Sequence, residues 1–211
     1  MEKVVENGVI TPCRMRVRLT FLTPILGSGN ANPKIHEDFI ASKSANKDKI
    51  AEEVEAIEDS VEDSIEKNRT VFSRMEDGTP CLWDYQIRGF FKHACGVMKK
   101  VPGSASASVK AHKKTVDDAV LIEERKIPIK FEGEITSNQR PLRASTPLGE
   151  RVCLADSEQL PESSTAEFTI LYLYPDLKDK IKEWLNYGYF QGIGQWRGSG
   201  RFGSFTWEEI N

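Results

Sequence analysis

The chain has 211 residues, with 29 basic against 32 acidic side chains and a formal net charge of −3. A chain of this length forms one domain with an elaboration, or at most two small domains. The slightly acidic balance excludes a globally basic nucleic-acid-binding protein, so any such site must be a local patch.

The cysteines and histidines are scattered along the chain. Neither set has metal-ligand spacing, so we expect no metal and no cofactor. Widely spaced cysteines without a CxxC pair indicate reduced, mostly buried thiols, and no signal peptide or long apolar run is evident. We therefore expect a soluble, cytoplasmic protein. The residues concerned are Cys13, Cys81, Cys95, Cys153, His36, His93 and His112.

Residues 14 to 22 alternate between apolar and mostly basic side chains, which predicts a half-buried strand with a basic outer face. That face suits ordinary solvation, or an edge guarded by charge. The apolar side carries Met15, Val17, Leu19 and Phe21, and the other side carries Arg14, Arg16, Arg18 and Thr20.

Residues 46 to 67 predict an amphipathic helix with one narrow apolar stripe among acidic and lysine residues. Two interpretations stay open: the helix packs on its own domain, or it forms a seam with a helix of a partner. The stripe consists of Ile50, Val54, Ile57, Val61 and Ile65.

A second helix is predicted over residues 86–100, with apolar and basic residues on opposite sides. The small residues that follow, together with Lys110 and His112, predict a mobile basic loop over 102–114, or a disordered solubilising one. The remaining expectations are strands at 119–122, 126–131, 165–174 and 201–208, a turn-rich stretch at 136–164, and a helix at 177–185 that ends by Gly188.

With the acidic helix set aside as an insertion, the order is strand, helix, strand, strand, helix, strand. This is the βαββαβ order of an α+β, ferredoxin-like (RRM-like) fold. Four antiparallel strands would carry two helices on one face. The other face would be free to bind, as in RNA-recognition modules of this order.

Residues 192–203, which we call the Gly-Arg loop, contain five glycines, two arginines and a tryptophan between the last helix and the last strand. Glycine permits positive φ and close backbone approach, and arginine donates forked hydrogen bonds to phosphate. The loop is therefore a candidate polyanion cradle. The alternative is a tight helix-to-strand turn with incidental arginines.

Four segments, in order, resemble the RAMP superfamily, the ferredoxin-like proteins of CRISPR effector complexes and crRNA processing. The loop, GIGQWRGSGRFGSF at 192–205, is similar to the family signature G-I-G-x-x-R-S-x-G-F-G-x-F. The other segments are VRLTFLTPILGSG at 17–29, which looks like the first strand and its TP…GSG loop, GTPCLWDYQIRGFFKHA at 78–94, which is similar to the P-x-I-P-G-S-S-L-K-G-x-L-R-x-A helix entry, and SEQLP at 157–161 before the strand at 168–173.

Three features depart from the family pattern. Residues 81–85, CLWDY, replace the small I-P-G-S-S turn, which puts that RNA-facing surface in doubt. The acidic insertion is unusual, and Arg201 is an extra residue in the loop. The resemblance spans most of the chain, so we expect a single RAMP-like domain over 1–211, with a helical insertion at about 46–67 and a hairpin or loop elaboration at about 132–164.

The resemblance implies binding of single-stranded guide RNA alongside other subunits of a ribonucleoprotein complex. Phosphate contacts are expected from basic side chains and loop N–H groups, and base stacking from the tryptophan. The predicted RNA-binding residues are Arg88, Lys92, Gly194, Trp196, Arg197, Gly198, Gly200 and Arg201.

Some members of the family cut RNA with a histidine general base, and some backbone subunits carry an aspartate after the first strand. The matching loop here offers His36, Glu37 and Asp38, of which His36 and Asp38 are the candidate catalytic residues. A solvated loop or a helix start accounts for the same residues. His112 suits a phosphate contact as well as catalysis, whereas His93 is expected to be packed or at the surface.

We therefore expect an RNA-binding subunit of a CRISPR-type antiviral complex, or a stand-alone relative of one, without commitment to nuclease activity. A second class is a protein-interaction module of the same fold, such as a phage-encoded mimic or inhibitor of a CRISPR effector, which the acidic balance favours. A third class is a metal-independent endoribonuclease.

Overall fold

The computed structural model describes residues 5–6, 9–30, 69–146 and 149–211, with side chains over 11–30, 69–141 and 155–211. The predicted acidic helix at 46–67 and the candidates His36 and Asp38 lie outside the described residues. The chain divides into two compact units. Unit 1 comprises 1–25, 73–134 and 160–211, and unit 2 comprises 26–72 and 135–159.

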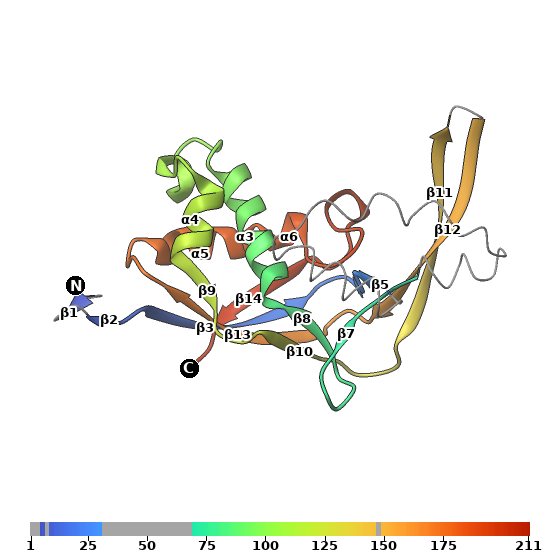
Figure 1. Cartoon of the computed structure of the whole chain (residues 1–211), viewed down its shortest axis with the longest axis horizontal. Helices are drawn as coiled ribbons and strands as arrows, with labels where there is room; N and C mark the ends of the chain where they lie inside the picture. The colour runs from blue at the N-terminus through green and yellow to red at the C-terminus, as the bar shows by residue number, and fades with distance from the viewer. Residues whose placement is uncertain (1–4, 7–8, 31–68, 147–148) are drawn as a thin grey trace, which may run out of the picture. The chain divides into compact units, whose positions relative to one another are not determined.

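Unit 1 contains a seven-stranded sheet in the order β14-β3-β13-β10-β8-β7, with β9 also paired to β13 (Figure 1). Every pairing in this sheet is antiparallel. The strands are β3 (Cys13–Phe21), β7 (Ser73–Arg74), β8 (Pro80–Trp83), β9 (Val120–Ile122), β10 (Lys126–Lys130), β13 (Thr165–Tyr172) and β14 (Phe205–Glu209).

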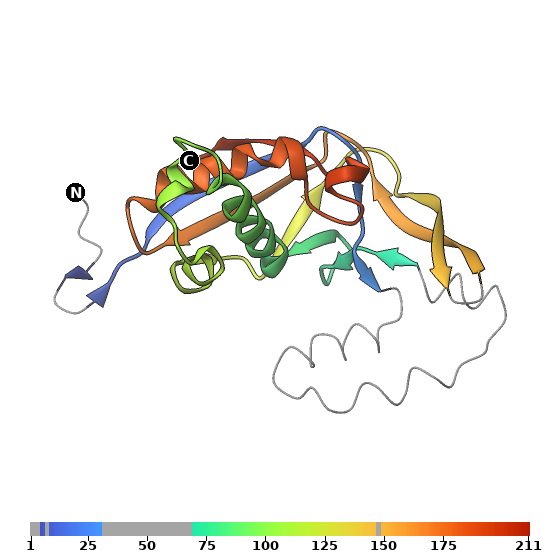
Figure 2. The ribbon, with the colours of Figure 1, turned by 90° about the horizontal axis from the view of Figure 1, so that it is seen from above.

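Helices cover one face of this sheet (Figure 2). They are α3 (Asp84–Met98), α4 (His112–Ala119), α5 (Leu177–Asn186) and the short α6 (Gly188–Gln191), with the 3₁₀ turns η1 (Ala105–Ser108) and η2 (Gly198–Gly200). The inward positions of β3 predicted from alternation are buried beneath them, as are Phe91 of α3 and Trp184 of α5. The protein is thus an α+β protein with antiparallel sheets.

The predicted strand at 14–22 and helix at 86–100 are confirmed by β3 and α3. The strands predicted at 119–122, 126–131 and 165–174 are confirmed by β9, β10 and β13. β3 is not an edge strand, because β14 and β13 pair with its two sides. The last strand begins at Phe205, later than predicted, because residues 201–203 belong to the Gly-Arg loop and Ser204 follows it. Gly188 does not end the helical region but begins α6.

The predicted mobile basic loop at 102–114 is wrong, because η1 and the start of α4 occupy it. Ser106 is fully buried. Its hydroxyl donates to Glu183 of α5 and accepts a 2.8 Å hydrogen bond from Nε1 of Trp184. The Glu183 carboxylate also accepts the N–H groups of Ala105 and Ser106, so η1 is fixed to α5 by paired polar groups.

Unit 2 contains a second sheet in the order β11-β12-β6-β5. The stretch at 136–164 was expected to be turn-rich, as a hairpin or loop elaboration. It forms two long antiparallel strands, β11 (Thr136–Thr146) and β12 (Gly149–Leu160), which pair from Thr136↔Gln159 to Thr146↔Gly149. The shorter strands are β4 (Ile25–Leu26), β5 (Gly29–Asn30) and β6 (Thr70–Val71), and a separate two-stranded sheet pairs β1 (Val5–Glu6) with β2 (Val9–Ile10).

None of the helices in the described parts of the chain is long and apolar enough to cross a membrane.

Candidate nucleic-acid interface

The Gly-Arg loop closes on itself through its two ends. The N–H of Ile193 donates to the carbonyl of Gly203 at 2.9 Å, and the N–H of Gly203 donates to Pro24 at 2.9 Å. Gly192 and Gly203 have φ of 69° and 66°, which L side chains rarely adopt. A Cβ on Gly203 would lie 1.8 Å from the Ile193 oxygen, so glycine is required where the two backbones meet.

The stem of the loop is anchored to the core of unit 1. A Cβ on Gly188 would lie 2.2 Å from the ring of Phe205, so α6 and β14 approach as closely as a glycine permits. Phe205 in turn packs edge-on against Phe21 and Phe90. The residues that flank the loop therefore pack against a cluster of aromatic rings.

The two loop arginines are exposed. Arg197 donates from Nη1 to the carbonyl of Gly194 at 2.9 Å, which holds its guanidinium over the loop. Arg201 has φ 60°, in the left-handed region, and its N–H donates to Gly198 at 2.9 Å. Trp196 also has positive φ and is half-buried. The loop thus presents two guanidinium groups on a tightly constrained backbone.

The predicted glycines have different environments. Gly194 is buried with φ 100°, and its observed part in the loop is to accept the Arg197 hydrogen bond. Gly198 and Gly200 are half-buried. They are the first and last residues of η2, and the exposed Ser199 lies between them. Contact between their N–H groups and phosphate stays a prediction.

The structure does not bring Arg88 and Lys92 to the Gly-Arg loop. Arg88 Nη2 and Lys92 Nζ approach Asp117 Oδ1 of α4 at 2.9 and 2.6 Å. Arg88 also lines a recess of about 350 Å³ with Pro12 and Tyr172, where β3 starts. The loop joins the far end of β3, and nine strand residues span roughly 25 Å. The eight predicted residues therefore form two separate groups.

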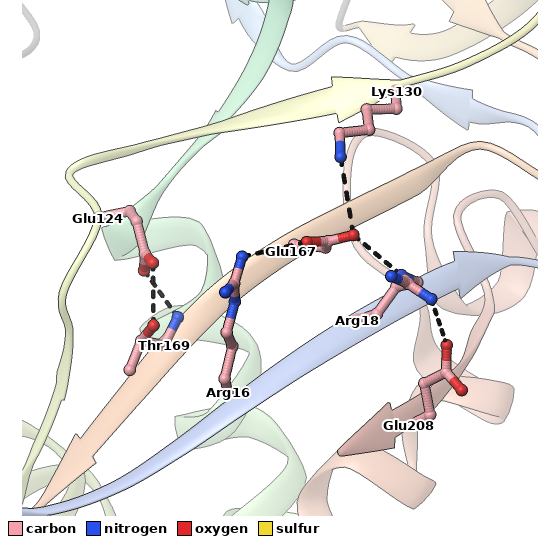
Figure 3. Close-up of polar contacts among 7 residues, drawn as sticks. All are labelled: Arg16, Arg18, Glu124, Lys130, Glu167, Thr169 and Glu208. Carbon is pink, nitrogen blue, oxygen red and sulfur yellow. Dashed lines mark hydrogen bonds and ion pairs between the residues drawn. The ribbon is translucent and has the colours of Figure 1, made fainter. Parts of the chain in front are cut away.

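The outer face of the sheet is not a basic surface, because acidic side chains of the neighbouring strands pair with its arginines (Figure 3). Glu167 of β13 accepts from Arg18 Nε at 2.9 Å and from Arg16 Nη2 at 3.3 Å. Arg18 also pairs with Glu208 of β14 at 2.8 Å, and Lys130 lies 3.7 Å from Glu167. We call this set the charge ladder.

Arginine contacts change the acid–base behaviour of Glu167. The hydrogen bond from Arg18, supported by the charges of Lys130 and Arg16, lowers the pKa of Glu167 below its ordinary value. Arg14 pairs similarly with Glu123 at the end of the same face. Because each arginine faces a carboxylate, this face has little net charge to attract a polyanion.

Glu124 fills the gap between β9 and β10, which pair with successive parts of β13. Its carboxylate accepts the N–H of Thr169 at 2.7 Å and the Thr169 hydroxyl at 3.0 Å (Figure 3). A side chain here replaces the backbone acceptor that an unbroken strand would supply.

The two described histidines, His93 and His112, lie in different surroundings. His93 is exposed on α3, and its ring lies 6.0 Å from that of Tyr187. Burial, and then the charges of Lys99, Lys113 and Lys100, lower the pKa of His112 at the start of α4. Within the described residues, no three His, Cys, Asp or Glu side chains gather as metal ligands.

Sequence reasoning missed the aromatic residues of α6. Tyr189 and Phe190 are 57% and 71% exposed, directly before the Gly-Arg loop. Sequence analysis did not single out these two residues because it expected the helix to end at Gly188. Their adjacency to the loop in sequence was the available signal.

One solved structure similar to this chain is a chain of the type III-B Cmr-beta, determined by cryo-EM with cognate target RNA bound. The TM-score is 0.51 at 11% sequence identity, and the match covers 94% of this chain and 59% of that one. At this identity the likeness shows a shared fold, and the protein spans about three fifths of the neighbour's length. No protein-family profile and no curated protein matches the sequence.

Proposed function

We propose that the protein is a RAMP-like RNA-binding protein, a subunit or stand-alone relative of a CRISPR-type ribonucleoprotein complex, and that the Gly-Arg loop binds the RNA backbone. The observation that carries the proposal is the constrained loop itself, which holds Arg197 and Arg201 exposed on one closed turn. Guanidinium groups held in this way suit phosphate oxygens.

The strand order supports a ferredoxin-like arrangement for unit 1. β14, β3, β13 and β10 are adjacent and antiparallel, α3 lies between β3 and β9 in the chain, and α5 lies between β13 and β14. This is the βαββαβ connectivity, and the single RAMP-like domain over 1–211 is proposed with it. The fold shared with an RNA-bound Cmr-beta chain supports the same proposal.

The proposal places the RNA on the loop rather than on the outer face of the sheet. RNA-recognition modules of this order stack bases on aromatic residues of the sheet. Here the same face carries the charge ladder, whose arginines are already paired with glutamates. Competition from those carboxylates disfavours phosphate there, whereas neither loop arginine has a carboxylate partner among the described residues.

The test is a titration of short single-stranded RNA at several salt concentrations with the intact protein and with Arg197→Ala/Arg201→Ala. The intact protein should bind in a salt-dependent manner. The double variant should bind more weakly, with the slope of log K against log salt reduced by about two, one for each lost phosphate contact.

The matched control is Arg14→Ala/Arg16→Ala, which removes the same number of positive charges from the outer face. This control should keep the salt slope of the intact protein. Equal losses in both double variants would contradict a local site. Absence of RNA binding at low salt would favour the protein-interaction module.

A further inference from the structure

We propose that the aromatic residues just before the Gly-Arg loop, together with His93 of α3, form a base-stacking platform, so that the protein binds unpaired bases beside the phosphates held by the loop. The platform consists of His93, Tyr187, Tyr189 and Phe190. This inference rests on the proposed RNA binding and adds a second, uncharged element to that site.

The platform has the geometry of a short stack. The rings of His93 and Tyr187 are 6.0 Å apart at 32°, and those of Tyr187 and Phe190 are 6.1 Å apart at 26°. Tyr189 meets Phe190 edge-on at 5.5 Å and 80°, an arrangement that buttresses the ring. Phe190 is the most exposed large apolar side chain in the described part of the chain, at 71%.

Water solvates an aromatic face poorly, so covering the exposed rings of Tyr189 and Phe190 with a ligand would be favourable. An unpaired nucleobase has a flat π surface that matches such a ring, and stacking contributes about 1–3 kcal/mol per base. Bases within a duplex are already stacked on their neighbours, so the platform favours unpaired over duplex RNA.

The platform is continuous with the loop. The N–H of Gly192 donates to the carbonyl of Gly188 at 3.1 Å, which joins α6 directly to the start of the loop. A Cβ on Gly198 would lie 3.2 Å from Oε1 of Gln191, so the residue after Phe190 touches the loop tip. Positive charge from Arg197 and Arg201 beside exposed rings favours a nucleic acid over an uncharged apolar partner.

The experiment compares two probes of equal length, an unstructured oligoribonucleotide and the same ribose-phosphate chain without bases. Tyr189→Ala/Phe190→Ala should weaken binding of the base-bearing probe by roughly 5- to 150-fold, equivalent to one stacked base. The salt slope should stay unchanged, because no phosphate contact is removed. The abasic probe should bind equally to the variant and the intact protein.

Two further variants separate stacking from general apolar contact. Phe190→Leu keeps an apolar side chain but removes the ring, and it should also bind the base-bearing probe weakly, whereas Phe190→Trp should bind it normally. Tyr174→Ala is the matched control, because Tyr174 is as exposed as Tyr189, at 57%, on another part of unit 1. It should bind both probes like the intact protein.

Three results would overturn the inference. If the alanine variant binds the base-bearing probe normally while Arg197→Ala/Arg201→Ala binds weakly, the proposed function stands and the platform does not. Normal binding by Phe190→Leu would indicate apolar docking in place of stacking. If the intact protein binds neither probe at low salt, the proposed function fails as well.

Discussion

At the residue scale, the loop depends on where glycine occurs. Gly203 combines φ of 66° with a backbone oxygen where a Cβ would stand, whereas Gly103, with φ of 80°, has open space around it. Both positions penalise an L side chain, but only Gly203 adds a collision with a backbone group that cannot rotate away.

Gly203→Ala should therefore lower the free energy of unfolding by more than about 3 kcal/mol. Gly103→Ala should lower it by about 1 kcal/mol, the cost of the left-handed conformation alone. Urea denaturation followed by tryptophan fluorescence measures both. Equal losses in the two variants would mean that the ends of the Gly-Arg loop do not meet as described.

At the element scale, the charge ladder ties β3 to β13 and β14 on the side away from the helices. Glu167 is the common acceptor of this network, and its side chain is only 19% exposed. The Arg18 contact lowers its pKa, so the folded protein binds the proton less readily than the unfolded chain does. The stabilisation is complete above the ordinary value of 4.5 and is lost as the pH falls through the lowered pKa.

Glu167→Gln should lower the free energy of unfolding by about 1–2 kcal/mol at neutral pH. It should also flatten the decline in stability from about pH 5 to about pH 3, because the titrating group is gone. Urea midpoints over this range measure the effect. Glu123→Gln, which breaks one exposed pair, should leave the curve nearly unchanged. An unaltered acid dependence in Glu167→Gln would show that the ladder does not couple to folding.

The elements that could be predicted are those in which apolar residues recur at a regular helical or strand spacing. β3, α3, β13 and α5 each alternate or repeat against one core, and the sequence patterns located them. A hairpin or loop elaboration was expected at about 132–164, but the long strands β11 and β12 were not located within it. Their described side chains are largely polar, and the two strands pair chiefly with each other. η1 was not predicted because a run of Ser and Ala resembles a flexible linker. The hydrogen bonds that order it come from Glu183, which is far along the chain.

The candidate site was predictable only in part. Glycine and arginine composition located the loop, since its backbone demands are local. Arg16 and Arg18 pair with Glu167, which is about 150 positions away in the chain. Considered alone, the sequence of β3 therefore predicted a basic face, although carboxylates of the neighbouring strands neutralise its arginines. Arg88 and Lys92 likewise pair with Asp117 of α4, a helix that the sequence patterns did not predict.

At the scale of the whole molecule, unit 2 is inserted twice into the chain of unit 1. Lys130 of β10 and Thr165 of β13 are directly paired, so the two ends of the segment that holds β11 and β12 leave neighbouring strands. A short turn can therefore close β10 to β13 without moving either strand.

Replacement of residues 135–159 by a short Gly-Ser turn should leave the sheet and helices of unit 1 folded. The expected result is one cooperative thermal transition and a retained near-ultraviolet circular dichroism signal from the buried Trp184. Loss of that signal would mean that unit 1 requires the hairpin. A scrambled hairpin of the same length is the control for chain length alone.

The contact between Gly188 and Phe205 has a consequence for binding kinetics. The stem of the loop cannot shift without displacing the ring that also touches Phe21 and Phe90, so we expect the stem to hold its position before the proposed RNA arrives. Little conformational entropy is then lost on association. Encounter should be limited by diffusion and ionic strength, with no slow isomerisation phase, and affinity differences between ligands should reside in their dissociation rates.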